Sequence, residues 1–447
     1  MKKSKYNIEV NDNGLLIFNT LSKELICLNG EAEKMYAQGI FVNSEFTEKL
    51  LKKNIIVDDD FDEFRYARFN HYKKILSDDL LEITIIPTQN CNFRCQYCFE
   101  PEEYSVMSYD IAERILKYLK KNLMRYKELV IDWFGGEPLL GRDIVLYIMN
   151  EIKQLCREYG VVLYSTMFTN GYELKRNLFE KLVDSGVRYF TICIDGNRET
   201  HNIQRPHKTD KDSYTRIVNN LLDISQNIKS NSDKFKILIR MNVSEQNVHT
   251  AKEFVKFYQE NFGEDHRFNI VWQWVHNWGG ERINETGLNE KLLGEDKCAE
   301  LYEYSLSLGL ISDEELSANS GREFCGAGKK NGFLIDCDGK LYKCYMAKTN
   351  PKTQDNAVLG FINSSGKLVI DDKINSQWVM PVEPGDKCRD CVYFPLCTGS
   401  SCPLSDNVIH KKARCFTYKK QMIQKIKNKK RCGKVEYITI NAGENMQ

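Results

Sequence analysis

The stretch from residue 81 to residue 275 alternates strand-like and helix-like segments, and this alternation limits the possible fold more than any other feature. The strand-like segments are Leu81–Ile86, Leu129–Phe134, Val162–Phe168, Tyr189–Ile194, Lys236–Val243 and Phe268–Val275. The segments with helical periodicity are Tyr109–Tyr126, Ile144–Tyr159, Leu174–Ser185, Ser213–Ile228 and Val248–Phe262. This pattern predicts an α/β fold, with a parallel sheet and right-handed crossovers curled into a partial (β/α)6 TIM-like barrel. In such folds the chemistry gathers at the carboxyl ends of the strands.

Three cysteines follow the first predicted strand: Cys91, Cys95 and Cys98, at CxxxCxxC spacing. Thiolates at such short intervals can converge on one soft metal centre, either zinc or an iron–sulfur cluster. A four-iron cluster with only three cysteine ligands leaves one iron open for a substrate or cofactor. The chain has 16 cysteines and no apparent export signal, which favours metal ligation over a disulfide framework.

The later predicted strands also end in glycine-rich or polar residues. Gly135-Gly136-Glu137-Pro138 follows the second strand, and its carboxylate can accept hydrogen bonds from an ammonium group. Thr169-Asn170-Gly171 follows the third strand. The fourth and fifth strands end at Asp195-Gly196, with Glu199, His201, Asn202 and Arg205 downstream, and at Arg240-Met241-Asn242. All these groups are therefore expected at the edge of the sheet that carries the cysteines.

Together these motifs resemble the radical S-adenosylmethionine (SAM) superfamily, in which SAM chelates the open iron of a [4Fe–4S] cluster. The resemblance implies that Cys91, Cys95 and Cys98 hold this cluster. It also implies a set of SAM-binding residues: Tyr97 in the CxxxCxΦC motif, Gly135, Gly136 and Glu137 at the amino group, Asn170, Asp195, Arg205 at the carboxylate and Asn242 at the ribose. We interpret His201 as structural rather than catalytic.

A second group of cysteines occupies the last third of the chain: Cys325, Cys337, Cys344, Cys388, Cys391, Cys397, Cys402 and Cys415. With Gly339 the series reads C…GxxxxC…CxxCxxxxxC…C, which resembles the SPASM extension with its two auxiliary iron–sulfur clusters. The resemblance implies a first auxiliary cluster on Cys325, Cys344 and Cys402, and a second on Cys388, Cys391, Cys397 and Cys415. Structural zinc is the alternative.

Two features depart from the SPASM pattern. The spacing from Cys397 to Cys402 is one residue longer than the usual CxxxC, and Cys337 has no counterpart. Cys337 is therefore either a fourth ligand of the first auxiliary cluster, or that cluster keeps an open iron that can bind a substrate thiolate.

The first 80 residues predict three strands, two helices and a further strand. This order resembles the winged-helix peptide-recognition module of ribosomal-peptide maturases, which holds a leader peptide by adding it to a sheet edge; a purely structural cap is the alternative. The predicted domains are an N-terminal module at 1–80, a radical SAM core at 81–305, a SPASM domain at 320–425 and a basic tail at 426–447. A helix with a basic face is expected over Lys419–Arg431.

The composition gives no sign of a nucleic-acid or membrane partner. The formal charge is +1, and no apolar run is long enough to span a bilayer. The expected setting is a reducing cytoplasm, with a flavodoxin or ferredoxin-type reductant.

The resemblance implies a peptide maturase that takes a hydrogen atom from a precursor peptide with a leader and forms a thioether or carbon–carbon cross-link. One alternative is an anaerobic sulfatase-maturase-like enzyme, which makes formylglycine. Those enzymes place an Asp after the GxxxxC cysteine, where this chain has Tyr345, a poor base at neutral pH. A tRNA-modifying enzyme is disfavoured by the neutral charge. Trp272 and Trp274 are expected on one side of the sixth strand, either as packing or as an apolar wall around a substrate.

Overall fold

The computed structural model describes the chain except for residues 43, 102–103, 230–233, 279, 309, 311–324, 350–352, 354–356, 381–382, 400–401, 405–418 and 440–447. The chain divides into two compact units. The larger unit comprises Ser77–Ile311 and Gly326–Val379. The smaller unit comprises Met1–Leu76, Ser312–Cys325 and Met380–Gln447. Within the described ranges, no helix is long and apolar enough to cross a membrane.

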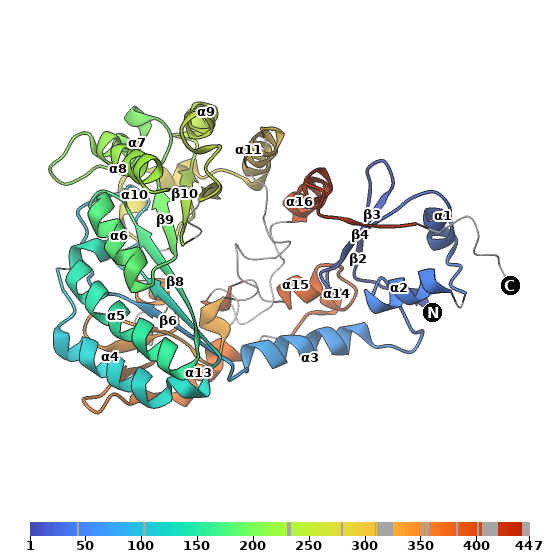
Figure 1. Ribbon diagram of the computed structural model, residues 1–447, viewed down its shortest axis with the longest axis horizontal. Coiled ribbons are helices and arrows are strands. Elements are labelled where there is room, and N and C mark those ends of the chain that lie inside the picture. The colour runs from blue at the N-terminus through green and yellow to red at the C-terminus, as the bar shows by residue number, and fades with distance from the viewer. Residues whose placement is uncertain are drawn as a thin grey trace. The chain divides into compact units, whose positions relative to one another are not determined.

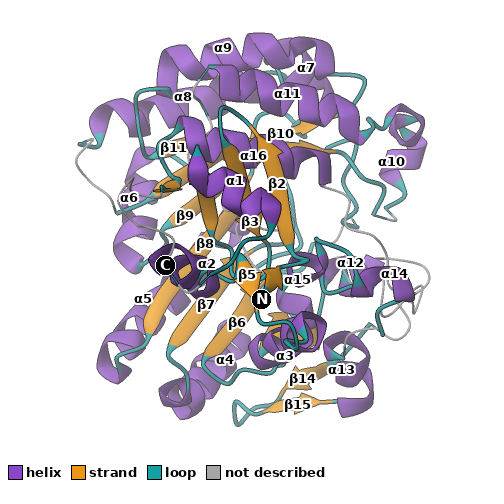
Figure 2. Ribbon diagram, turned by 90° about the vertical axis from the view of Figure 1, so that its right-hand side faces the viewer, coloured by secondary structure: helices purple, strands orange, loops and turns teal. Residues whose placement is uncertain are grey.

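Strands β6 to β11 form the predicted parallel sheet of the larger unit and lie side by side in sequence order (Figure 2). Their bounds are Leu80–Ile85, Glu128–Trp133, Val162–Thr169, Tyr189–Cys193, Lys236–Val243 and Phe268–Trp274. The connecting helices are α4 Tyr109–Asn122, α5 Arg142–Tyr159, α6 Arg176–Ser185, α8 Ser213–Asn227 and α9 Ala251–Phe262. The predicted α/β fold with its partial-barrel sheet is confirmed.

Shorter elements complete this unit. The 3₁₀ turns are η1 Leu123–Arg125, η2 Pro138–Gly141, η3 Val248–Thr250, η4 Leu288–Lys291 and η5 Gly326–Gly328. The additional helices are α7 Arg198–Gln204, α10 Arg282–Glu285, α11 Glu295–Ser307, α12 Tyr345–Thr349 and α13 Asp372–Val379.

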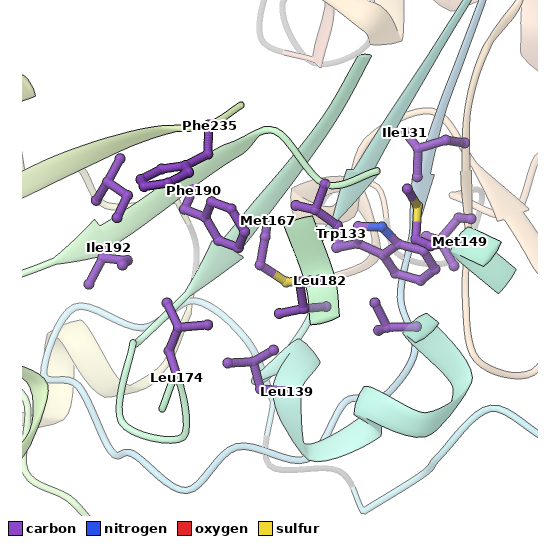
Figure 3. Packing of buried hydrophobic residues seen from close by; sticks show 14 of the residues in the cluster. Ile131, Trp133, Leu139, Met149, Met167, Leu174, Leu182, Phe190, Ile192 and Phe235 are labelled. Carbon is purple, nitrogen blue, oxygen red and sulfur yellow. The ribbon is translucent and has the colours of Figure 1, made fainter. Parts of the chain in front are cut away.

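A dry layer of apolar side chains joins the sheet to its helices. Figure 3 shows Trp133 from the end of β7 near Met149 of α5, and Met167 of β8 near Leu182 of α6. All four side chains are fully buried. Because burial of one such side chain contributes about 1.5–3 kcal/mol, this layer holds the strands in place and so positions the loops at their carboxyl ends.

The sheet continues beyond β6 with strands from the cysteine-rich part of the chain. β12 (Gly332–Ile335) pairs with β6 in parallel, and three antiparallel strands follow it. These are β13 Lys340–Tyr342, β14 Gly360–Ile362 and β15 Leu368–Ile370. Gly339, at φ +81°, makes the turn between β12 and β13 in a conformation that favours glycine.

The smaller unit is built around a four-stranded sheet with the order β16-β4-β3-β2. The predicted three-stranded meander is present as β2 Asn7–Asn11, β3 Leu15–Asn19 and β4 Leu25–Leu28. The other elements are β1 Lys2–Lys3, α1 Glu31–Gln38, α2 Glu45–Lys52, β5 Ile56–Val57, α3 Glu63–Ile75, α14 Asp386–Arg389, α15 Phe394–Cys397, α16 Lys419–Arg431 and β16 Glu436–Ile438.

Both faces of this small sheet are covered, and each face is covered by a different part of the chain. Helices α1 and α2 cover one face through side chains such as Tyr36 and Leu50. Met422 and Ile426 of α16 and Leu396 of α15 cover the other face (Figure 1). Strands near the start of the chain and helix α16 near its end therefore contribute to one apolar cluster.

Candidate functional site

The loop that carries Cys91, Cys95 and Cys98 is fixed by backbone pairing with residues 204–208. Lys208 N donates to Asn92 O at 2.9 Å, Arg94 N to Pro206 O at 2.8 Å, and Gln96 N to Gln204 O at 2.9 Å. Phe93 and His207 form an antiparallel bridge at the centre of this pairing. The cysteine loop is therefore held by the segment that begins with Asp195-Gly196, the motif at the end of β9.

The three thiols are half-buried. Loss of solvation raises the pKa of Cys91 to about 12, that of Cys95 to about 11 and that of Cys98 well above its usual value. The nearby Glu100 carboxylate and then Cys95 raise the pKa of Cys98 further. Three soft donors whose free thiolates are disfavoured suit an iron–sulfur cluster, because positive iron ions stabilise the thiolate form.

In the described part of the chain, no three His, Cys, Asp or Glu side chains are close enough together to hold a single metal ion. Ligands of one zinc ion all lie about 2.0–2.3 Å from it. The loop supplies three thiols, and thiolates are the ligands that hold iron–sulfur clusters.

The two glycines after β7 let that loop approach the segment that leads into Cys91. A Cβ at Gly135, whose φ is +110°, would lie 2.6 Å from the carbonyl oxygen of Thr88. A Cβ at Gly136 would lie 2.4 Å from the carbonyl oxygens of both Gln89 and Asn90. Gly136 N in turn donates to Thr88 O at 3.2 Å. In this structure the glycines serve a contact between two backbone segments.

Glu137 is buried, and its carboxylate is oriented by three donors. Oε1 accepts from Leu139 N at 3.0 Å and from the Thr169 hydroxyl at 2.6 Å, and Oε2 accepts from Asn170 N at 2.7 Å. Burial raises the pKa of Glu137, while these donors act in the opposite direction. The Asn170 amide donates to Asn92 Oδ1 at 2.8 Å. Glu137 and Asn170 are therefore joined to the cysteine loop.

Four of the predicted SAM-binding residues meet in a second buried network. The Tyr97 hydroxyl donates to Asp195 Oδ2 at 2.6 Å and accepts from the Asn242 amide at 2.9 Å and from the Arg205 guanidinium. Asp195 Oδ1 also accepts from Asn242 N at 2.8 Å. Residues from the cysteine loop, β9, α7 and β10 are thus brought together at the carboxyl ends of the strands.

The surroundings of this network orient Arg205. Its guanidinium lies over the Phe93 ring at 5.6 Å, and its buried Nε has no hydrogen-bond partner among the described residues. His201 Nδ1 accepts from Asp195 N at 3.1 Å, which places the proton of the neutral ring on Nε2. Burial and then the charge of Arg205 hold the pKa of His201 well below its usual value. His201 thus supports the backbone of Asp195 as a neutral group.

The sequence analysis missed two polar residues that complete this region. Asn247 is fully buried, and its amide donates to Asn242 O at 2.9 Å and to Gln204 Oε1 at 3.1 Å. The Gln204 amide donates to Ser244 Oγ at 2.8 Å. Their only signal in the sequence is their place just beyond a strand-end motif.

Glu100 is a half-buried acid with no motif signal in the sequence. Its Oε2 has no hydrogen-bond partner among the described residues. Burial raises the pKa of Glu100 to about 8; Lys348 acts against this, and Glu137 and Asp336 add to it. Glu100 therefore lies among charged groups of the cysteine loop, the β7 loop and the cysteine-rich segment.

Aromatic rings line the mouth of the barrel beside these motifs. Tyr345, which follows Cys344, is buried, with its ring 6.1 Å from that of Phe99 and 6.0 Å from that of Phe134. Phe134 in turn lies 5.5 Å from Phe168. Trp272, in contrast, packs on Phe254 and donates to Ser305 Oγ at 2.8 Å, so it contacts helices α9 and α11.

The later cysteines lie in both units. In the larger unit, Cys337 is buried and its thiol contacts Ser105 Oγ at 3.3 Å, and Cys344 is half-buried. In the smaller unit, Cys325 is exposed, Cys397 is buried, and three cysteines are half-buried: Cys388, Cys391 and Cys402. Cys415 lies outside the described residues. Cys388, Cys391 and Cys397 follow one another along α14, the next turn and α15.

The comparison with family models supports this arrangement. The model of the Radical SAM superfamily matches residues 85–258, which include the cysteine loop and each strand-end motif described above. The chain therefore contains a radical SAM domain, the kind of domain that combines a [4Fe–4S] cluster with SAM.

Comparison with particular proteins extends this result. The chain is 26% identical to the Fe-coproporphyrin III synthase of Methanosarcina barkeri over 36% of this chain and 36% of that one. It is 24% identical to the cysteine-type anaerobic sulfatase-maturating enzyme of Clostridium novyi over 69% of this chain and 84% of that one. The chain thus spans little more than a third of the first relative and most of the second.

A solved structure of native anSMEcpe with bound AdoMet and the Kp18Cys peptide has the same fold. The TM-score is 0.58 at 17% sequence identity, and the match covers 80% of this chain and 100% of that one. This likeness concerns the fold, and it extends beyond the residues matched by the family model.

Proposed function

We propose that this chain is a radical SAM oxidoreductase that removes a hydrogen atom from a peptide and oxidatively modifies it. The observation that carries this proposal is the convergence of the CxxxCxxC loop with Glu137, Asn170 and the Tyr97 network at one edge of the sheet. When bound, the cluster and SAM supply a carbon-centred radical able to take a hydrogen atom from an unactivated C–H bond.

Each polar group of the site then has a task in binding SAM. Cys91, Cys95 and Cys98 hold the cluster. Glu137 accepts hydrogen bonds from the ammonium group, because its carboxylate is buried and already oriented. Arg205 binds the carboxylate, since guanidinium offers parallel donors and its Nε is not engaged by any described residue.

The remaining residues position the cofactor and keep water out. Asn242 is assigned to the ribose and Asp195 to the ribose or the methionyl side, and Tyr97 keeps both side chains in place through its hydroxyl. Gly135 and Gly136 let the β7 loop lie against the backbone before Cys91. The rings of Phe99, Phe134, Phe168 and Tyr345 form an apolar wall that excludes water from the reacting centre.

The later cysteines are proposed to hold two auxiliary [4Fe–4S] clusters. Cys325, Cys344 and Cys402 are assigned to the first and Cys388, Cys391, Cys397 and Cys415 to the second, with Cys337 either a fourth ligand of the first or not a ligand. Held by these cysteines, the clusters would supply a redox partner for the oxidation of the substrate. Their ligands come late in the chain, and binding would add to the folding energy of this region.

The proposed substrate is a ribosomally made precursor peptide with a leader, and the proposed product carries a thioether or carbon–carbon cross-link. The small sheet of the N-terminal module supports this proposal, because a sheet edge can hold an extended peptide. A reducing cytoplasm and a flavodoxin or ferredoxin-type reductant complete the proposal.

A second candidate is the formation of formylglycine, which the resemblance to anaerobic sulfatase maturases implies, and the chain is similar to one sulfatase-maturating enzyme. The match covers 84% of that relative, and this extent favours the candidate. Tyr345 speaks against it, because the phenol packs among aromatic rings where a carboxylate base would be needed.

The test compares the anaerobically reconstituted wild type with the Cys91→Ala/Cys95→Ala/Cys98→Ala variant. Iron, sulfide and 5′-deoxyadenosine formation are measured in both. We expect about twelve irons per chain to fall to about eight, with loss of SAM cleavage. SAM cleavage that persists in the triple variant would refute the radical SAM assignment. About four irons in the wild type, with zinc retained, would refute the auxiliary clusters.

A further inference from the structure

The C-terminal strand β16 occupies one edge of the N-terminal sheet. Residues 436, 437 and 438 pair in parallel with residues 26, 27 and 28 of β4. Without this short strand, β4 would be the edge of the sheet. Edge strands present unpaired backbone groups that accept an added strand, and this added strand comes from the chain itself.

We propose that β16 is a displaceable occupant of a peptide-binding edge, and that an extended peptide with a carboxylate two residues before an aliphatic side chain takes its place. The proposal rests on the proposed function in one respect, namely that this peptide is the leader of the substrate. The chemistry of the edge is read from the contacts of β16 itself.

The aliphatic position is defined by Ile438. This side chain is only 3% exposed and joins the apolar cluster that includes Leu28 of β4 and Tyr36 of α1. Tyr437, one residue earlier, is 54% exposed, as expected for alternating sides of a strand. A peptide that replaces β16 therefore needs an aliphatic side chain here and can vary at the preceding position.

The acidic position is defined by Lys53, the C-cap residue that follows α2. Its ammonium group lies 2.7 Å from the Glu436 carboxylate and 2.9 Å from that of Glu24, and its side chain is 18% exposed. The same Lys53 therefore binds one acid from the sheet and one from the added strand. A carboxylate on the incoming peptide would replace that of Glu436 at this lysine.

Displacement of β16 leaves the rest of the unit in place. Only three residues pair with β4, and two of them are exposed. The preceding helix α16 is held independently through buried Met422 and Ile426. Lys430 adds a contact to Asn13 O at 3.1 Å. The strand can thus leave the edge while its helix stays on the sheet.

The first experiment measures binding of a fluorescein-labelled peptide, Gly-Lys-Val-Glu-Tyr-Ile-Thr, which corresponds to residues 433–439. It is titrated into the full chain and into a variant that ends at Cys432. We expect binding to the shortened chain about 10- to 100-fold tighter than to the full chain, because β16 competes within the same molecule. Equal affinity for the two proteins, or no binding to the shortened one, would overturn the proposal.

A second variant guards against misfolding of the shortened chain. Glu436→Lys/Ile438→Asp keeps the full length and removes both side-chain contacts of the strand, with Lys53 and with the apolar cluster. It should bind the same peptide with the affinity of the shortened chain. The charge pairing is tested with Lys53→Glu in the shortened chain. This variant should no longer bind the peptide, but it should bind a version of the peptide in which the position of Glu436 is lysine. Failure of this exchange would overturn the assignment of Lys53.

The outcome is independent of the chemistry of the radical site. If SAM is cleaved but the peptide does not distinguish the proteins, the inference fails and the proposed function stands. If the peptide binds as expected but SAM is not cleaved, the proposed function fails and the inference about the sheet edge stands. A concentration-dependent dimer of the full chain in sedimentation velocity that disappears in the shortened chain would assign the edge to a second copy instead and overturn the peptide assignment.

Discussion

Replacement of Gly136 by alanine should separate the β7 loop from the cysteine loop. The new Cβ would lie 2.4 Å from the carbonyl oxygens of Gln89 and Asn90, and contacts under 3.0 Å are essentially never seen. One backbone must therefore move by about 0.6 Å, and both neighbours are main chain rather than a flexible side chain. A misplacement near 1 Å can cost about 100-fold in rate, so we expect SAM cleavage to fall by about 10- to 100-fold.

The assay measures iron content and 5′-deoxyadenosine formation after anaerobic reconstitution, together with the free energy of unfolding. Overpacking of this kind costs about 1–3 kcal/mol, so the variant should remain folded. Gly294→Ala is the matched control, because among the described residues no heavy atom beyond its chain neighbours lies within 4 Å of the added Cβ. Wild-type iron content and wild-type SAM cleavage in Gly136→Ala would refute the view that this close backbone contact positions the site.

Three further predictions concern single side chains of the larger unit. Tyr97→Phe removes the hydroxyl that links Asp195 to the Asn242 amide and the Arg205 guanidinium. The free energy of unfolding should therefore fall by about 1–3 kcal/mol, and KM for SAM should rise. An unchanged KM would contradict the network. His201 is buried and its pKa is lowered, so below about pH 6.5 only the unfolded chain takes up a proton at this residue. As the pH falls from there, the free energy of unfolding should decrease by about 1.4 kcal/mol per pH unit until the pKa of the folded state is reached. His201→Asn should remove this slope in unfolding measured at pH 7.5 and 5.5, and an identical slope would contradict the assignment. Arg267→Met leaves the half-buried Asp265 and several carbonyl groups without their donor, so the free energy of unfolding in chemical denaturation should fall by about 3–5 kcal/mol. SAM cleavage per folded molecule should stay the same, and its loss in folded protein would contradict a purely structural role.

The parallel core could be predicted from the sequence because its pattern is local. Each strand of the parallel sheet and each of the five long connecting helices has its own apolar periodicity, and short right-handed crossovers leave little choice of strand order. The strand-end position of Glu137, Asn170, Asp195 and Asn242 follows from the same rule, since the carboxyl ends of parallel strands share one edge.

The hydrogen bonds that join these residues could not be predicted in the same way. The pairing of residues 204–208 with the cysteine loop depends on where α7 ends, and short helices have weak sequence signals. The three bonds of the Tyr97 hydroxyl require side-chain positions from several segments to agree within fractions of an ångström. Asn247 and Glu100 were missed because nothing in the local pattern distinguishes a buried polar residue from an exposed one.

The sequence by itself determined the α/β core, the edge at which its motifs gather and the positions of the cysteines, because these follow from local periodicity and spacing. Only the tertiary structure decided how distant segments combine. β12 joins the parallel sheet beside β6, and α16 and β16 complete the N-terminal unit around Ile438. Such contacts link residues several hundred positions apart, and they depend on complementary shape and charge rather than on the pattern of either segment alone.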